Sequence, residues 1–150
     1  MKLVPQDIEA RFRRNAVRVT RQRAAIYAAL VETSSHPSAE DLYRMVKRQQ
    51  PMMSRNTVYY TLGVLRNAGL VREVNVGHDM ARYDGNVCMH HHLICLGCGQ
   101  IMDVMDDDLN QLQLSSGQAR GFDVVGHRVE FHGYCVSCQQ AERNVSPRRT

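Results

Sequence analysis

Two Cys-x-x-Cys pairs, separated by a long stretch of chain, limit the fold of this protein more than any other sequence feature. The pairs are Cys95/Cys98 and Cys135/Cys138, and a run of three histidines precedes the first pair. A turn of this kind directs two thiolates at one ion, and two such turns supply the four soft ligands that tetrahedral Zn²⁺ favours. The gap between the pairs is longer than in a compact zinc ribbon. We therefore expect a structural zinc ion that joins two separate strands.

Disulfides or buried thiols are the alternatives for these cysteines. The first residues of the sequence are charged and contain no apolar run, unlike a secretory signal. Since disulfides form mainly in oxidising compartments, we expect a cytoplasmic protein with reduced thiols. No stretch approaches the roughly 20 apolar residues that a membrane-spanning helix needs, so no membrane partner is expected. The fifth cysteine, Cys88, is expected to be an ordinary thiol.

Charge is divided unevenly along the 150 residues, whose net charge is +4. Residues 1–83 contain 14 Lys and Arg against 7 Asp and Glu, whereas residues 84–150 contain 5 against 8. A basic half favours a polyanionic partner such as nucleic acid. We therefore predict a DNA-binding domain over residues 1–83, a hinge over 84–89 and a metal-containing domain over 90–150.

Four helices are predicted in the basic half. A short helix covers residues 7–14, and Thr20, Ser38 and Ser54 are placed to cap the N-termini of three more. Behind these caps, apolar residues recur at the spacing of one buried helix face. The residues expected to be buried on the three capped helices are Ile26, Leu30, Val31, Leu42, Met45, Val46, Val58, Leu62 and Leu65.

A β-hairpin is predicted after the last helix. Residues 71–76 and 80–83 have the composition of two strands around a turn that contains Gly77. Helices in this order followed by a hairpin are typical of a winged helix-turn-helix, a DNA-binding fold. We therefore predict an α+β chain whose fourth helix, residues 55–67, enters the major groove.

The fourth helix carries most of the side chains expected to contact DNA. Its outward residues supply cations, an amide and aromatic rings, which suit phosphates and base edges. Arginines near the start of the second helix are expected to hold the phosphate backbone. The alternative is a helical packing module with an ordinary solvated face. The residues predicted to contact DNA are Arg18, Arg21, Arg23, Arg55, Asn56, Tyr59 and Tyr60.

A second metal site is indicated by the histidines before the first cysteine pair. His90 and His92 are two residues apart in an extended segment, so they share one face while His91 points away. Asp84 lies where the two halves join, and Asp103 ends the next predicted strand. Imidazoles mixed with carboxylates suit harder divalent ions such as Fe²⁺ or Mn²⁺. The alternatives are a surface histidine run without a specific role and a weak zinc scavenger.

Four motifs, together with the second cysteine pair, are spread over nearly the whole chain, from Arg18 to Cys138. They are R-x-T-x-Q-R from Arg18, His36-Pro37-Ser38-Ala39, Thr57-Val58-Tyr59, and HHHLICLGCG from His90. Through them the chain resembles the ferric uptake regulator family. The resemblance implies an N-terminal winged helix, a small α/β dimerisation domain, a homodimer and metal-dependent repression of transcription. It adds Thr57 to the DNA-contacting residues. The ligands that it implies for a regulatory Fe²⁺ or Mn²⁺ are His36, Asp84, His90, His92 and Asp103.

The carboxylate positions indicate a branch of this family. Iron-responsive members usually have Glu there, whereas the peroxide-responsive branch has Asp, as this chain does at Asp84 and Asp103. The resemblance then implies that Fe²⁺-catalysed oxidation of His36 or His90 removes a ligand and releases double-stranded DNA, an AT-rich inverted repeat. An iron-responsive repressor is the alternative.

An enzymatic role and a third metal ion are not expected. Catalytic metal sites keep an open position, whereas five potential ligands would fill this one, so a metalloenzyme is the less favoured interpretation. A zinc-stabilised protein-interaction module would leave the basic helices unexplained. The resemblance matches a further metal site of some members to Met89, His91, Asn110 and His127. Two of these are poor ligands, and we expect His127 to be an exposed or hydrogen-bonded strand residue.

Overall fold

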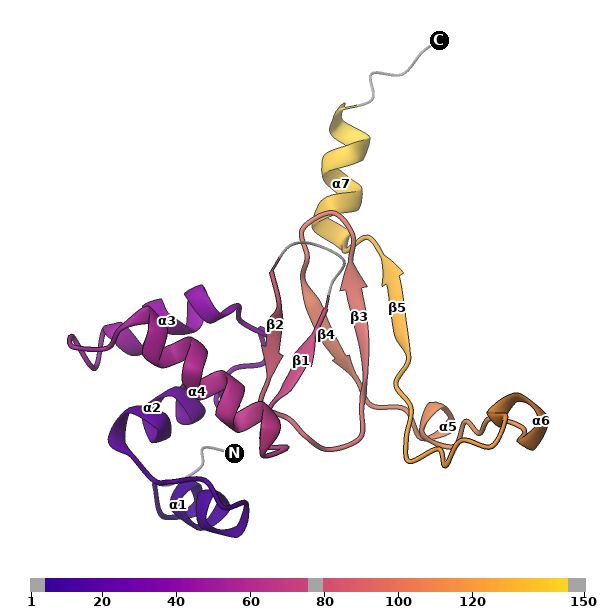
Figure 1. The fold of residues 1–150 in the computed structure, drawn as a ribbon. Coiled ribbons are helices and arrows are strands. Elements are labelled where there is room, and N and C mark those ends of the chain that lie inside the picture. Colours follow the sequence, from indigo (N-terminus) through magenta and orange to yellow (C-terminus); the bar gives the residue numbers. More distant parts are fainter. Residues whose placement is uncertain (1–4, 76–79, 146–150) are drawn as a thin grey trace. The chain divides into compact units, whose positions relative to one another are not determined.

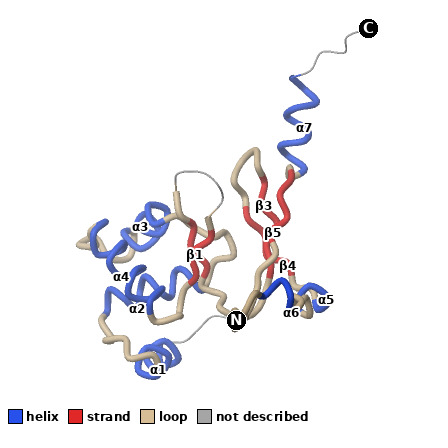
Figure 2. Tube along the Cα trace, turned by 45° about the vertical axis from the view of Figure 1, so that its right-hand side comes forward, coloured by secondary structure: helices blue, strands red, loops and turns tan. Residues whose placement is uncertain are grey.

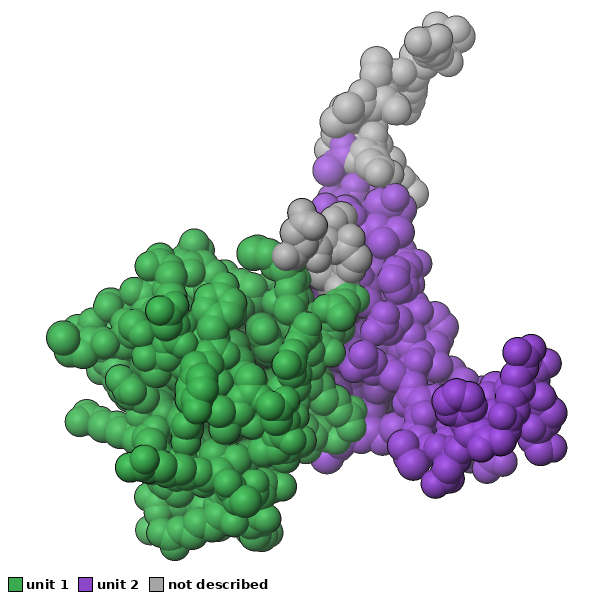
Figure 3. Space-filling view, viewed as in Figure 1, with its two compact units in different colours: residues 1–87 green, residues 88–150 purple. Residues whose placement is uncertain are grey.

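The computed structural model describes residues 5–75 and 80–145 (Figure 1). Helices dominate its first part and strands form the centre of its second part (Figure 2). The chain divides into two compact units, residues 1–87 and 88–150 (Figure 3). The predicted hinge, residues 84–89, spans this division. Within the described residues, no helix has the length and apolar character needed to cross a membrane.

The described residues of the first unit form four helices and a two-stranded sheet. The helices are α1 (Pro5–Arg14), α2 (Arg21–Val31), α3 (Ala39–Lys47) and α4 (Arg55–Asn67), and the strands are β1 (Arg72–Val74) and β2 (Arg82–Asp84) (Figure 1). The two strands pair antiparallel, with Glu73 opposite Tyr83. This order of helices and strands confirms the predicted winged helix-turn-helix. The turn expected at Gly77 lies outside the described residues.

Local hydrogen bonds set where the helices of this unit begin and end. Thr20 and Ser54 each accept a hydrogen bond from a backbone N–H of the helix that follows. Ser38 and Asp41 form a reciprocal capping box at the start of α3. Each cap stabilises its helix by about 1 kcal/mol. Gly69, just after α4, has φ +69°, a left-handed conformation that ends helices and favours glycine.

The core of the first unit contains most of the residues predicted from the apolar spacing. Seven of the nine are buried, and Val31 is partly buried against them. Met45 is 36% exposed, so its predicted burial was wrong. The buried face of α3 includes Leu42 and Val46, and Met45 lies about 100° around the helix from Val46. Spacing alone therefore placed Met45 too close to the centre of the buried face.

A three-stranded sheet is the centre of the second unit. Its strands are β3 (His91–Cys95), β4 (Ile101–Val104) and β5 (Glu130–Gly133), in the order β4-β3-β5. β3 pairs antiparallel with β4 and parallel with β5. Along the chain, the short helices α5 (Asp107–Asn110) and α6 (Ser116–Ala119) come after β4 and before β5, and α7 (Val136–Val145) follows β5 (Figure 1).

Candidate metal centres and nucleic-acid interface

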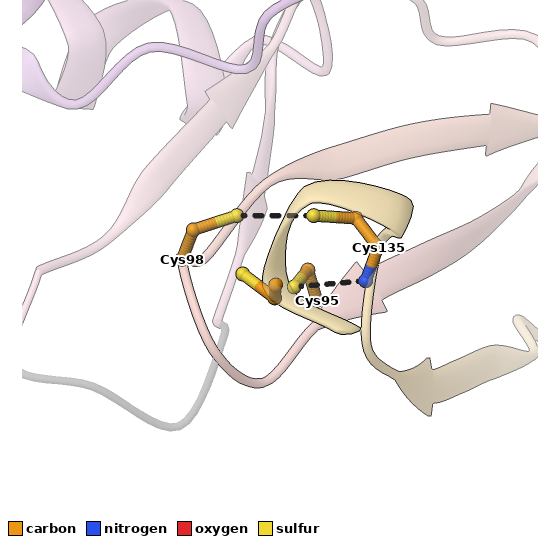
Figure 4. Close-up of side chains that lie close together, drawn as sticks. Cys95, Cys98 and Cys135 are labelled. Atoms are coloured by element: carbon orange, nitrogen blue, oxygen red, sulfur yellow. Dashed lines mark hydrogen bonds between the residues drawn. The ribbon is translucent and has the colours of Figure 1, made fainter. Parts of the chain in front are cut away.

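The sheet topology of the second unit brings the two cysteine pairs together. Cys95 ends β3 and Cys135 follows β5, and these strands are parallel neighbours whose C-terminal ends meet at one edge. Cys98 lies in the turn between β3 and β4, and Cys138 lies in the first turn of α7. The four sulfur atoms lie within 4.8 Å of one another. Figure 4 shows the cluster, with Cys98 facing Cys135.

The sulfur positions fit a tetrahedral metal ion. The Sγ atoms of Cys98 and Cys135 are 3.8 Å apart. Four Zn–S bonds of about 2.3 Å in a tetrahedron place the sulfur atoms about 3.8 Å from one another. A disulfide needs a separation of about 2.05 Å, and all five cysteines are free thiols. The cluster therefore has the ligand number, chemistry and spacing of a structural zinc site.

A glycine and a backbone N–H lie in close contact with the sulfur atoms of this cluster. A Cβ at Gly97 would lie 2.8 Å from Cys138 Sγ, so a larger residue would push the turn away from the sulfur. The backbone N–H of Cys135 donates to Cys95 Sγ at 3.2 Å (Figure 4). This hydrogen bond, with those from Cys98 and Gly97, lowers the pKa of Cys95 to about 6. Thiol–thiol contacts, first with Cys135, raise the pKa of Cys138 to about 12. A thiol with a raised pKa, such as Cys138, retains its proton at neutral pH, and a divalent ion must displace that proton when it binds.

A second group of ligating side chains lies at the start of β3. His90 and His92 share one face, as predicted, and both are buried, with their Nε2 atoms 3.0 Å apart. Asp103, on β4, lies opposite His92 of β3. Its Oδ1 atom lies 3.6 Å from His90 Nε2 and 3.9 Å from His92 Nε2. His90 Nδ1–H donates to the carbonyl O of Cys88 at 2.8 Å. In the neutral ring, Nε2 therefore carries the lone pair that a metal ion requires.

The first unit contains a buried histidine–aspartate pair. His36 Nε2 lies 3.8 Å from Oδ2 of Asp84, the last residue of β2. His36 Nδ1–H donates to the carbonyl O of Ser34 at 3.1 Å, so Nε2 of the neutral ring again carries the lone pair. His36 has φ +48°, a conformation that costs about 1–2 kcal/mol for a residue other than glycine. The chain around it is fixed by the bond from Tyr83 N–H to Pro37 O.

His91 lies on the opposite face of β3 and belongs to a hydrogen-bonded network. Its Nδ1 accepts from Val129 N–H at 3.0 Å, so its Nε2–H donates to Asn110 Oδ1 at 3.2 Å. His127 stacks on His91, with 5.7 Å between ring centroids, and donates to the carbonyl O of Leu109 at 2.6 Å. His127 is therefore hydrogen-bonded as predicted, although it precedes β5 instead of lying in a strand.

α4 and the start of α2 present the side chains predicted to contact DNA. Tyr59 and Tyr60 are 54% and 67% exposed. The Arg23 guanidinium lies 5.8 Å from the centroid of the Tyr60 ring, which brings a cation of α2 to the same surface. Arg18 and Arg21 are exposed beside it in sequence. This surface combines aromatic rings with cations.

The first turn of α4 holds the other three predicted residues. Asn56 is exposed, and the Thr57 hydroxyl is hydrogen-bonded to the capping hydroxyl of Ser54 at 2.8 Å. Arg55 Nε and Nη2 donate to the two carboxylate oxygens of Glu40 at 2.9 and 3.0 Å. The hydrogen bond from Arg55 is the largest cause that lowers the pKa of Glu40. Sequence reasoning missed Glu40, because no local pattern links residues on two different helices.

Sequence comparison places this chain among known regulators. A profile of the ferric uptake regulator family matches residues 14–132. The peroxide-responsive repressor PerR of Staphylococcus aureus is 36% identical over 130 residues, which cover 87% of this chain and 88% of that protein.

Solved structures with the same fold include regulators of two kinds. The Helicobacter pylori ferric uptake regulator Fur, described as having three functional metal-binding sites, matches with a TM-score of 0.75 at 21% identity, over 92% of this chain and 95% of that chain. The Campylobacter jejuni peroxide stress regulator matches with a TM-score of 0.68 at 27% identity, over 91% and 99%. These matches confirm the predicted α+β fold, a winged helix followed by a smaller α/β domain.

Proposed function

Because the chain belongs to the ferric uptake regulator family, we propose that it is a metal-dependent transcriptional repressor that senses peroxide by oxidation of its own histidine ligands. The observation that carries the proposal is the buried pair His90 and His92 with Asp103 beside it, in the same unit as the sulfur cluster. One group of ligands is soft and suits a structural ion, and the other is harder and suits a regulatory one.

We assign structural Zn²⁺ to the sulfur cluster. Cys95, Cys98, Cys135 and Cys138 come from the ends of two parallel strands and from α7. Four thiolates leave no position open for substrate, so the ion would stabilise the fold and take no part in a reaction. Its binding free energy becomes folding free energy for the second unit.

We assign a regulatory Fe²⁺ or Mn²⁺ to five ligands drawn from both units. His36 and Asp84 come from the first unit, and His90, His92 and Asp103 come from the second. The hydrogen bonds from Nδ1–H of His36 and His90 place the lone pair of each neutral ring on Nε2, the atom that would bind a metal. Ligands from two units favour a single arrangement of those units when they share an ion, so metal would bias the protein toward a DNA-binding state.

Peroxide sensing is proposed to act through His36 and His90. When bound, Fe²⁺ would activate hydrogen peroxide beside these two rings. The net step adds one oxygen atom of the peroxide to a ring carbon and releases the other as water. The oxidised ring no longer ligates well, so the metal-bound state is lost and the DNA is released. Asp at both carboxylate positions supports this branch over an iron-responsive repressor.

Double-stranded DNA is the proposed partner, in the form of an AT-rich inverted repeat. The predicted arginine, amide and tyrosine side chains of α2 and α4 would contact phosphates and base edges. A two-fold dimer places two recognition helices in successive major grooves, which requires inverted half-sites. The proposed contacts are Arg18, Arg21, Arg23, Arg55, Asn56, Thr57, Tyr59 and Tyr60.

A homodimer is supported by an apolar row on the sheet of the second unit. Met102, Leu93 and Phe131 lie opposite one another on β4, β3 and β5. They are 53%, 47% and 43% exposed, respectively. Neighbouring apolar side chains that remain exposed in a single chain are typical of a protein–protein interface. We therefore propose that this face packs against a second copy.

A gel-shift titration tests the proposal. Zinc-loaded protein is titrated onto an AT-rich inverted repeat with Mn²⁺, with Fe²⁺ and with chelator, and each sample is repeated after a peroxide pulse. We expect binding with either ion, loss of binding with chelator, and release by peroxide only in the Fe²⁺ sample. Metal-dependent binding that survives peroxide with Fe²⁺ would favour the iron-responsive alternative, and binding that ignores metal would contradict both.

A further inference from the structure

Resting on the DNA-binding function proposed above, we propose that Glu40 is a positioning residue that holds Arg55 for bidentate recognition of a guanine in the major groove. Glu40 lies in the first turn of α3, and Arg55 is the first residue of α4.

The guanidinium of Arg55 has two edges that can each make a pair of hydrogen bonds. Glu40 accepts from the Nε–Nη2 edge at 2.9 and 3.0 Å. These bonds do not use the edge formed by Nη1 and the second N–H of Nη2. The Arg55 side chain is 60% exposed, whereas that of Glu40 is 25% exposed. The carboxylate therefore occupies one edge of the guanidinium, and the Arg55 side chain remains accessible.

Glu40 holds one edge of the Arg55 guanidinium, and the ring of Tyr43 restricts the orientation of its plane. Arg55 lies 4.5 Å from the centroid of the Tyr43 ring, within the range of a cation–π contact. α3 is also tied to the segment just before α4, because Lys47 Nζ donates to the carbonyl O of Met53 at 2.9 Å. A side chain already ordered loses less conformational entropy when it binds. Arg55 is thus preorganised before DNA arrives.

The position and chemistry of this edge suit guanine. The N-terminal residues of a recognition helix are those that contact base edges. Guanine offers O6 and N7 to a planar pair of N–H groups, which is the commonest specific contact of arginine with DNA. An arginine that is not held can turn to a phosphate instead, and that contact carries no sequence information.

The arginine at the other end of α4 lacks this arrangement. Arg66 bonds Glu73 through Nη1 and lies in the last turn of the helix. One bond leaves the guanidinium able to rotate, and the last turn of a recognition helix is less suited to base contact. On α4, the two-bond arrangement therefore belongs to Arg55 and its partner Glu40.

Selection from a randomised duplex library tests the inference with full-length protein loaded with Zn²⁺ and Mn²⁺. The parent is expected to enrich one fixed guanine in each half-site. Changing that G·C pair to A·T should weaken its binding about 5- to 150-fold, the discrimination of a good bidentate contact. Glu40→Gln and Arg55→Lys should bind both duplexes nearly equally, since one loses the holder and the other the planar fork.

A matched control and a second readout separate positioning from simple charge. Glu9→Gln removes the same charge from a surface pair with Arg13 on α1 and should keep the discrimination of the parent. Glu40→Gln should bind the A·T duplex at least as tightly as the parent does, because Arg55 becomes able to contact phosphate. Zinc content and circular dichroism confirm that each variant is folded.

The outcomes distinguish this inference from the proposed function. If the parent selects no guanine, or if Glu40→Gln keeps the discrimination of the parent, Glu40 does not position Arg55 for base recognition. If the parent loaded with Zn²⁺ and Mn²⁺ binds no duplex, the proposed function is wrong and the inference fails with it.

Discussion

Removal of one zinc ligand should unfold the second unit and leave the first unit folded. In the described part of the second unit, the buried apolar side chains are Ile94, Cys95 and Ile101. Fully burying an isoleucine contributes about 1.5–3 kcal/mol, so Ile94 and Ile101 together contribute about 3–6 kcal/mol. Structural zinc sites in small domains contribute about 10–16 kcal/mol. A zinc ion bound at the cluster would therefore be the larger stabilising contribution in this unit.

The first unit does not depend on the cluster in this way. Its helices bury a continuous core that includes Phe12 and Tyr27, whose ring centroids are 5.4 Å apart. Cys95→Ser is the sharpest perturbation, because Cys95 is 6% exposed and accepts the backbone N–H of Cys135. A serine hydroxyl is a poor zinc ligand of almost the same size, so packing changes little while the site loses a thiolate.

Hydrogen exchange read by mass spectrometry, together with zinc content, is the measurement. In Cys95→Ser, we expect zinc to be lost, the amides of β3 and β5 to exchange rapidly, and those of α2 and α4 to stay protected. Cys88→Ser is the matched control and should keep both zinc and protection, since Cys88 lies outside the cluster. A zinc-free Cys95→Ser protein with protected β3 amides would refute the reasoning.

Four further predictions follow from single residues. Tyr59→Ala should weaken specific DNA binding by about 1–3 kcal/mol with metal content unchanged; equal affinity in a fluorescence titration would exclude a base contact. Leu93→Glu should give a monomer in analytical ultracentrifugation, because it places a charge on the apolar row; a stable dimer would place the interface elsewhere. Asp103→Glu should keep metal-dependent DNA binding but reduce oxygen addition to the histidines, and equal oxidation would remove the stated basis for the peroxide-responsive branch. The hydrogen bond from Ser38 lowers the pKa of Asp41 in the folded protein. The ionised carboxylate therefore stabilises the fold at pH values above the ordinary carboxyl pKa, and this stabilisation is lost as the pH falls through the lowered pKa. Asp41→Asn should therefore show a weaker loss of stability in acid, measured by thermal unfolding between neutral and acid pH.

Features that depend on neighbouring residues were predictable from the sequence. The caps at Thr20, Ser38 and Ser54 were predictable because an N-cap requires only a side-chain oxygen two or three residues before a backbone N–H. His90 and His92 share a face because an extended chain alternates its side chains. The convergence of the cysteine pairs was predictable because a tetrahedral ion requires four ligands, and the four sulfur atoms do lie together.

Features that depend on the packing of distant segments were not predictable in the same way. The parallel pairing of β3 with β5 decides which strand ends meet, and no turn signal specifies it. The pairing of Glu40 with Arg55 depends on how α3 packs against α4. Met45 was misplaced because apolar spacing gives the direction of a buried face but not its width.

Peptide mass analysis of peroxide-treated protein tests the central claim most directly. Protein loaded with Zn²⁺ and Fe²⁺ is exposed to less than one equivalent of peroxide, and DNA binding is measured on the same sample. We predict one added oxygen atom in the peptides that contain His36 or His90, in proportion to the DNA binding lost, and neither change with Mn²⁺. Loss of DNA binding with unmodified histidines, or with oxidation only at cysteines, would contradict the account.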